Sequence, residues 1–133
     1  MDDKILEVKN LHVSFDTYAG EVKAIRDLSF EVRRGETLAI VGESGSGKSV
    51  TVQTIMKLIP MPPGRIKSGE ILFEDIDLVK ASPKKMRELR GGKIGMIFQD
   101  PMTSLNPTIK IGKQIMEVIK LHKKVSKLDC LKL

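Results

Sequence analysis

Residues 42–49 read Gly42-Glu43-Ser44-Gly45-Ser46-Gly47-Lys48-Ser49, which matches the phosphate-loop pattern G-x-x-x-x-G-K-[ST] at every required position. Glycines in such a loop allow backbone conformations that are closed to other residues, so amide N–H groups can approach phosphate oxygens. The helix that follows the loop adds its positive N-terminal end. The stretch therefore predicts an anion-binding turn.

The segments on either side supply the context that this motif requires. Before the loop, the short apolar run Thr37 to Val41 predicts a strand covered on both faces in a parallel sheet. After it, Val52, Ile55, Met56 and Ile59 recur at the spacing of one helical face, and the proline-rich stretch that follows must end that helix. The order strand, loop, helix favours a nucleotide-binding fold.

Further elements follow from the same periodicities. Alternation over residues 11–15 and 28–33 predicts two half-buried strands, and further strands are expected at 70–77 and 93–98. Ser82 and Pro83 predict the start of a short helix that ends at Gly91 and Gly92, and a helix carrying Ile111, Ile115, Val118 and Ile119 follows a loop at 100–107. The predicted fold class is α/β, a partial P-loop NTPase (RecA-like) core joined to an N-terminal antiparallel β portion.

The residues of the loop are expected to contact a nucleotide, and two of them have specific roles. Lys48 should reach the β- and γ-phosphates, and the Ser49 hydroxyl should complete the coordination of a Mg²⁺ ion that bridges them. ATP and Mg²⁺ are therefore the predicted ligands. The residues expected to contact the nucleotide here are Gly42, Glu43, Ser44, Gly45, Ser46, Gly47, Lys48, Ser49 and Val50.

Charge and hydropathy limit the other function classes. The net charge of +6 would suit a polyanion, but the lysines are spread along the chain and the sequence has only one Tyr, four Phe and no Trp. A nucleic-acid-linked P-loop ATPase is thus a disfavoured alternative. The longest aliphatic run, Leu38 to Val41, is far shorter than the roughly 20 residues of a membrane span, and the first four residues are no signal peptide. Any membrane role is expected to run through a partner.

Three stretches together resemble the ATP-binding subunits of ABC transporters, in particular the oligopeptide/dipeptide (peptide/nickel) importer branch. They are Gly35-Glu36-Thr37-Leu38, the loop itself, and Phe98-Gln99-Asp100-Pro101-Met102-Thr103-Ser104-Leu105-Asn106-Pro107. A phosphate loop alone is shared by kinases, GTPases and DNA-repair ATPases, whereas the run from Phe98 to Pro107 looks much more specific to peptide and nickel importers. The likeness covers nearly the whole chain.

The resemblance implies partners and further site residues. It implies transmembrane permease subunits, a second ATP-binding subunit in a homo- or heterodimer, and a peripheral place on the cytoplasmic face of the membrane. Gln99 matches the Q-loop glutamine, which contacts Mg²⁺ and the attacking water and couples the site to the membrane subunit. Lys48 and Gln99 are thus the expected catalytic residues, and Ser49 and Gln99 the expected metal ligands. An amide suits this role because its oxygen can bind Mg²⁺ without adding charge.

Two further positions are expected near the nucleotide. At one, several residues are candidates for stacking on adenine, and at the other this sequence departs from the family pattern. Tyr18 lies about where the family's A-loop aromatic stacks on adenine, with Phe15 and Val22 as alternatives. Many relatives follow the Mg²⁺-binding serine with a threonine that helps to hold the α-phosphate, whereas Val50 offers only its amide. Nucleotide binding is expected to survive this difference.

The segments that normally follow the Q-loop do not occur in residues 1–133. They are the signature segment, the second acidic strand (Walker B) with its catalytic glutamate, and the switch histidine. The chain is therefore expected to be the N-terminal part of an ABC ATP-binding domain, from Walker A through the Q-loop and the following helix. It should bind Mg²⁺-ATP without hydrolysing it efficiently alone, although the family hydrolyses ATP. A non-catalytic truncated remnant or interaction fragment is the alternative.

Overall fold

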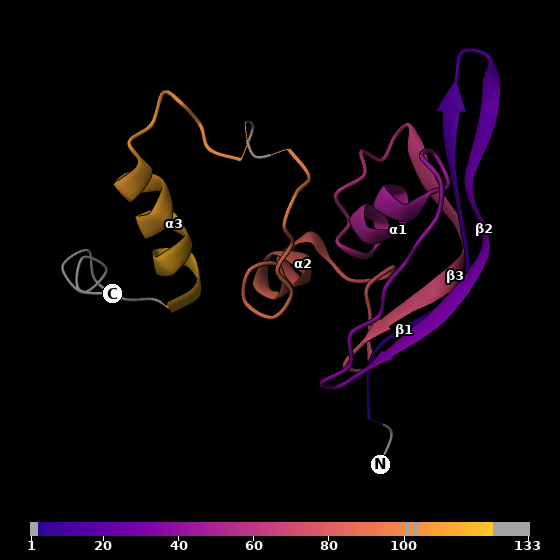
Figure 1. Cartoon of the computed structure of the whole chain (residues 1–133), viewed down its shortest axis with the longest axis horizontal. Coiled ribbons are helices and arrows are strands. Elements are labelled where there is room, and N and C mark those ends of the chain that lie inside the picture. The colour runs from indigo at the N-terminus through magenta and orange to yellow at the C-terminus, as the bar shows by residue number, and fades with distance from the viewer. Residues whose placement is uncertain (1–2, 101, 103, 124–133) are drawn as a thin grey trace. The chain divides into compact units, whose positions relative to one another are not determined.

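The computed structural model describes residues 3–100, 102 and 104–123. The chain forms two compact units, Met1–Ser82 and Pro83–Leu133, each with its own internal packing. The first unit holds the β-sheet, the phosphate loop and its helix, and the second holds two helices and the segments between them (Figure 1). Each unit is described by itself.

The first unit is built on a four-stranded antiparallel sheet. Its strands are β1 (Lys4–Thr17), β2 (Gly20–Arg33), β3 (Gly64–Phe73) and β4 (Ile76–Asp77), in the spatial order β2-β1-β3-β4. β1 pairs with β2 through a tight hairpin in which Thr17 faces Gly20, and its other edge pairs with β3. The predicted N-terminal antiparallel β portion is confirmed, and its strands are longer than the alternating residues indicated.

The expected single strand over residues 70–77 is wrong in detail, because the chain turns within it. Glu74 and Asp75 both have positive φ, 44° and 64°, and they connect β3 to β4 with Phe73 opposite Ile76. Two central residues with φ > 0 define the turn type that matches the twist of a hairpin. A short β4 thus folds back on β3.

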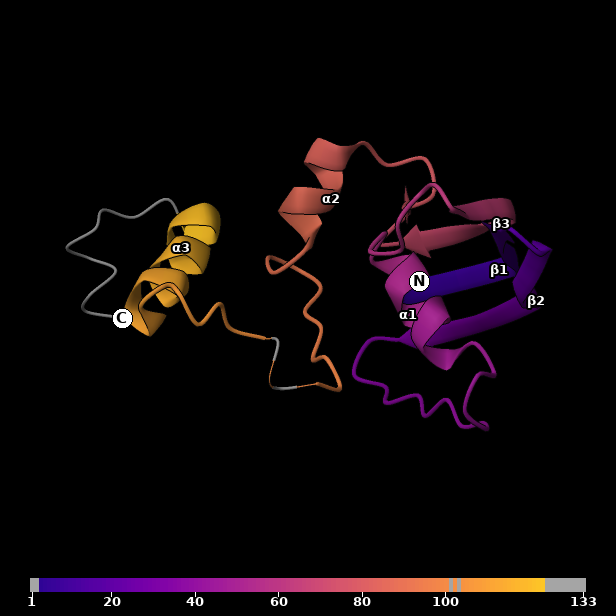
Figure 2. The same cartoon turned by 90° about the horizontal axis from the view of Figure 1, so that it is seen from above.

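α1 (Lys48–Ile55) packs on one face of this sheet (Figures 1 and 2). The buried core contains sheet residues, led by Leu11, Val13 and Ile71, and residues of α1 and the turn after it, namely Ile55, Met56 and Ile59. The helix ends at Ile55, before the prolines. Val52, expected on the buried stripe, is instead exposed, and Thr51 and Thr54 are buried. Two hydroxyl-bearing residues therefore face inward.

The segment Thr37 to Val41 is not the covered strand that the sequence predicted. It has no strand assignment, and Leu38, Ile40 and Val41 are 42%, 44% and 88% exposed. A parallel strand forms only by hydrogen bonding to neighbouring strands. Within the described residues no strand lies beside this segment, so its apolar side chains face outward.

The second unit contains α2 (Pro83–Leu89) and α3 (Ile111–Lys123). α2 begins at the predicted proline and ends just before Gly91, which has φ 76°. The strand expected over 93–98 is wrong: only an isolated bridge joins Ile94 to Arg90, and Ile97 is 99% exposed. The predicted α3 is confirmed, and none of its residues is buried: Ile111, Ile115 and Val118 are exposed, and Ile119 is half-buried. No helix in the described part of the chain is long and apolar enough to cross a membrane.

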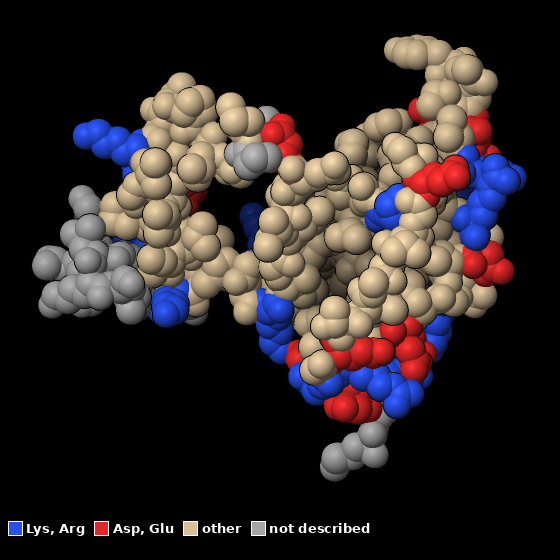
Figure 3. All heavy atoms as spheres, in the orientation of Figure 1, with Lys and Arg blue, Asp and Glu red and all other residues tan. Residues whose placement is uncertain are grey.

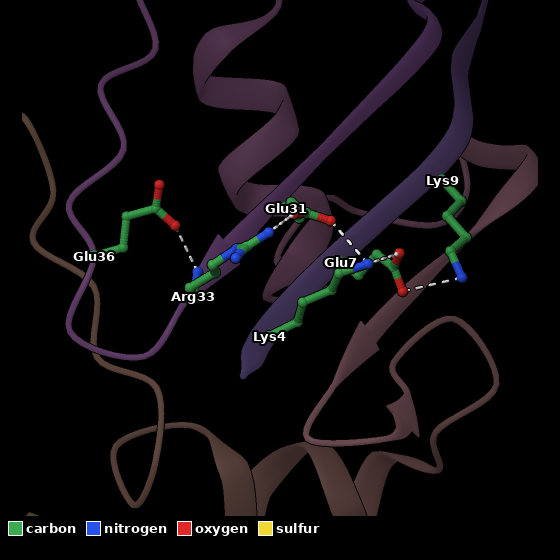
Figure 4. Close-up of polar contacts among 6 residues, drawn as sticks. All are labelled: Lys4, Glu7, Lys9, Glu31, Arg33 and Glu36. Carbon is green, nitrogen blue, oxygen red and sulfur yellow. Dashed lines mark hydrogen bonds and ion pairs between the residues drawn. The ribbon is translucent and has the colours of Figure 1, made fainter. Parts of the chain in front are cut away.

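Acidic and basic side chains alternate at one end of the sheet, where Figure 3 shows them interspersed. The Lys4 ammonium lies 3.1 Å from Glu7 and 2.9 Å from Glu31, on neighbouring strands (Figure 4). Lys9 pairs with Glu7 at 3.0 Å, and Arg33 pairs with Glu31 at 3.2 Å. Among the described residues, the cations of this cluster are thus each paired with a carboxylate.

These pairs lower the pKa of both glutamates. Hydrogen bonds from Lys9 and then Lys4 hold the pKa of Glu7 below its ordinary value of 4.5, and those from Lys4 and then Arg33 do the same for Glu31. A carboxylate whose pKa is lower in the folded state binds fewer protons there than in the unfolded chain. Its stabilisation is therefore present above pH 4.5 and is lost as the pH falls through the lowered pKa.

We predict that the chain loses stability as the pH drops below 4.5, and that the double variant Glu7→Gln, Glu31→Gln shows a shallower loss. Urea unfolding at several pH values between 3 and 7, in low salt, measures this dependence. Glu88→Gln, a matched change outside the cluster, is the control. An equally steep pH dependence in the double variant would refute the assignment.

Candidate phosphate-binding site

The phosphate loop leads directly into the first turn of α1. Gly45 and Gly47 have φ 80° and 93°, and Gly47 is the left-handed N-cap residue of the helix. Ser46 N–H donates to the Glu43 carbonyl at 3.2 Å, which closes a turn within the loop. The predicted loop-to-helix order is confirmed.

The Lys48 side chain folds back over this turn. Its ammonium donates to the carbonyl oxygens of Gly42 at 2.5 Å and Glu43 at 2.7 Å, and it lies 3.3 Å from the Ser46 hydroxyl. Carbonyl dipoles therefore hold the positive charge within the residues that form the loop. Gly42 suits this packing, because a Cβ there would lie 2.7 Å from the Ser46 Oγ.

Several backbone donors at this point suit an anion. Within the described residues, the amide N–H groups of Gly45, Gly47, Lys48 and Ser49 donate to no protein acceptor. The first N–H groups of a helix have no partner inside it, and their partial positive charge favours a bound anion. Unpaired amides and one ammonium together fit the charge and hydrogen-bonding capacity of phosphate groups.

Contacts with β2 and with α1 hold Gly47 in place. A Cβ at this position would lie 2.9 Å from the Ala24 carbonyl oxygen, so only glycine lets the loop approach β2 this closely. Its own carbonyl accepts the Thr51 backbone N–H at 2.9 Å and the Thr51 hydroxyl at 2.8 Å. Thr51 is not among the residues predicted from the sequence; its only signal there is a hydroxyl one helical turn beyond the last loop glycine.

The predicted metal ligands lie in different units. Ser49 is exposed in the first turn of α1, and Gln99 is exposed in the second unit. Their shared role in holding Mg²⁺ stays a prediction. The described residues contain no group of three or more His, Cys, Asp or Glu that could hold a metal by itself.

The aromatic candidates for adenine lie on the β1–β2 hairpin. Tyr18 is in the tight turn at its tip and is fully exposed. Phe15 is partly buried and pairs in register with Val22. Figure 1 shows the tip of the hairpin extending beyond α1. The contact of Tyr18 with adenine stays a prediction.

Side-chain hydrogen bonds order the segment that follows Gln99. Asp100 accepts the Met102 N–H at 2.9 Å, and Asn106 accepts the Thr108 N–H at 2.9 Å. Gln114 of α3 accepts the Asn106 N–H at 3.0 Å and donates to the Asn106 carbonyl at 2.9 Å. The loop is thereby tied to the start of α3; Pro101 and Thr103 lie outside the described residues.

Comparison with known proteins agrees with these features. The sequence profile of the ABC transporter family matches residues 25–132. The chain belongs to the ABC transporter family. The family predicted from the loop and from the run Phe98 to Pro107 is thus confirmed.

Curated relatives come from the peptide-transport branch. The oligopeptide transport ATP-binding protein OppD of Bacillus subtilis (strain 168) is 68% identical over 124 residues, which cover 93% of this chain and 35% of that protein. The dipeptide transport ATP-binding protein DppD of the same organism is 56% identical over 125 residues, covering 94% of this chain and 37% of that protein. The ABC chain therefore spans about a third of the length of these relatives.

Solved structures support the fold. A dimeric ATP-binding cassette in a post-hydrolysis state, bound to ADP and phosphate, matches with a TM-score of 0.79 and 22% identity, covering 96% of this chain and 53% of that one. At this identity the likeness concerns the fold. The predicted partial P-loop core is therefore confirmed, even though the described residues of the ABC chain form no parallel sheet.

We predict that Gly47→Ala destabilises the first unit more than Gly45→Ala. Both glycines have positive φ, where a side chain costs about 1–2 kcal/mol. Only the Gly47 substitution also drives a methyl group onto the Ala24 carbonyl, because nothing lies within 4 Å of a Cβ at Gly45. Urea unfolding measures the difference, and equal losses for the two variants would contradict the close approach to β2.

Proposed function

We propose that this chain is the Mg²⁺-ATP-binding part of an ABC importer for peptides. The observation that carries the proposal is the loop Gly42–Ser49, where unpaired amides and the Lys48 ammonium converge at the start of α1. The high identity to oligopeptide and dipeptide transport ATP-binding proteins supports the choice of peptides as cargo. The specific peptide would be selected by other subunits.

Different residues of the loop would bind different parts of Mg²⁺-ATP. The amides of Gly45, Gly47, Lys48 and Ser49 would hydrogen-bond the phosphate oxygens. The Lys48 ammonium would leave its carbonyl acceptors and bind the β- and γ-phosphates. The Ser49 hydroxyl would hold Mg²⁺, which when bound neutralises phosphate charge. Val50 would contribute its amide, since its side chain has no hydroxyl.

Gln99 would link nucleotide to transport. Its exposed amide side chain could complete the Mg²⁺ coordination through oxygen, in the role implied by the family resemblance. Transmembrane permease subunits would dock near it, and a second ATP-binding subunit, identical or different, would cover the nucleotide. These partners would place the chain at the cytoplasmic face of the membrane.

We predict that the 133-residue chain binds Mg²⁺-ATP and that Lys48→Ala weakens binding by at least about tenfold, because a charge-assisted hydrogen bond is worth about 1.5–3 kcal/mol. Isothermal titration calorimetry measures the affinity. Lys84→Ala removes the same charge at an exposed position of α2 and should bind like the unchanged chain. No binding by a folded, unchanged chain would refute the proposed function.

We further predict that bound ATP is turned over negligibly by this polypeptide. Glu43 belongs to the loop, Asp100 accepts the Met102 N–H, and Glu117 lies on α3, so none of these three acids lies at the end of a strand. A steady-state phosphate-release assay tests this expectation. Brisk turnover that disappears in Lys48→Ala would show that the chain carries its own catalytic base.

A further inference from the structure

Two donors from one residue fix the carbonyl of Gly47. The Thr51 backbone N–H reaches it at 2.9 Å, and the Thr51 hydroxyl reaches it at 2.8 Å. We propose that Thr51 is a positioning residue for phosphate binding, whose hydroxyl sets the orientation of the peptide between Gly47 and Lys48. The inference rests on the proposed function, because it concerns the same phosphate loop.

The geometry of the peptide bond connects this carbonyl to the site. In a trans peptide, the C=O of one residue and the N–H of the next lie in one plane and point in opposite directions. The Gly47 carbonyl points along α1 toward Thr51, so the Lys48 N–H points out of the helix N-terminus. That N–H is one of the unpaired amides of the loop. A contact that fixes the direction of the Gly47 carbonyl therefore also fixes the direction of the Lys48 N–H.

Gly47 needs such a restraint. Its φ of 93° belongs to a region where glycine moves freely between neighbouring conformations, and it has no side chain to anchor it. The Ala24 carbonyl limits its approach to β2, but it does not fix the rotation of the following peptide. The second hydrogen bond from Thr51 supplies this restraint.

The bond is protected from solvent. Thr51 is 3% exposed, so water does not compete effectively for its hydroxyl. Threonine hydroxyls commonly bond to the carbonyl four residues earlier in a helix. Thr51 differs in its acceptor, which belongs to the N-cap glycine of the loop and not to the body of the helix.

Thr54 provides an internal comparison. It is 1% exposed, and its hydroxyl donates to the Val50 carbonyl at 2.6 Å, within α1. The two threonines thus share burial, helix and type of hydrogen bond. Only the acceptor of Thr51 lies in the phosphate loop.

The test replaces each hydroxyl by a methyl group of the same size in the 133-residue chain. Thr51→Val keeps the backbone bond to Gly47 and removes the hydroxyl bond, so Mg²⁺-ATP affinity should fall about three- to tenfold. Thr54→Val should keep the affinity of the unchanged chain, and Thr51→Ser, which restores a hydroxyl, should recover most of the loss. Calorimetry gives the affinities, and thermal unfolding shows whether the two valine variants are equally stable.

Each outcome bears on the inference separately from the proposed function. Absence of ATP binding by the unchanged chain overturns the proposed function, and the inference falls with it. Normal binding by the unchanged chain together with equal affinities in Thr51→Val and Thr54→Val overturns the inference alone. If Thr51→Val does not fold, Thr51→Ala is measured; failure of both to fold while Thr54→Val folds would assign the hydroxyl to the fold and also overturn the inference.

Discussion

The pairing of β1 along both of its edges holds the first unit together. β2 and β3 are far apart in the sequence, and each bonds one side of β1. This arrangement buries Leu11 and Val13 of the central strand. Since α1 packs on the same sheet, the position of the phosphate loop depends on the register of β1 with β2. A slip of one residue would exchange the two faces of the strand and remove the surface on which α1 rests.

The loop acquires its form from contacts on each side of Gly47. β2 contributes the Ala24 carbonyl, which excludes any side chain at the glycine, and α1 contributes Thr51, which holds the glycine carbonyl. Neither contact involves a charged group. The Lys48 ammonium and the unpaired amides can therefore be presented to an anion by a backbone that neutral groups keep in place.

The apolar segments before the loop and before Gln99 remain exposed because no strand pairs with them in the described part of the chain. Val41 and Ile97 lie in segments whose apolar residues are typical of buried strands, but both side chains remain almost fully exposed. Hydrophobic residues favour burial, yet a strand also needs a neighbour to bond its backbone. In the part of the chain that the structure describes, the only extended sheet is the antiparallel one.

The sequence by itself determined the phosphate loop, the helices on either side of Gln99, and the family, because these depend on residue types at fixed spacing along the chain. The pattern places Gly47 and Lys48 at the end of the loop, and Pro83 likewise marks the start of α2. The tertiary structure alone decided that Glu74 and Asp75 turn the chain between β3 and β4, that Val52 faces solvent, and that Thr51 bonds the loop. Periodicity reports which residues are apolar, whereas these features depend on which backbone groups and neighbours meet in space.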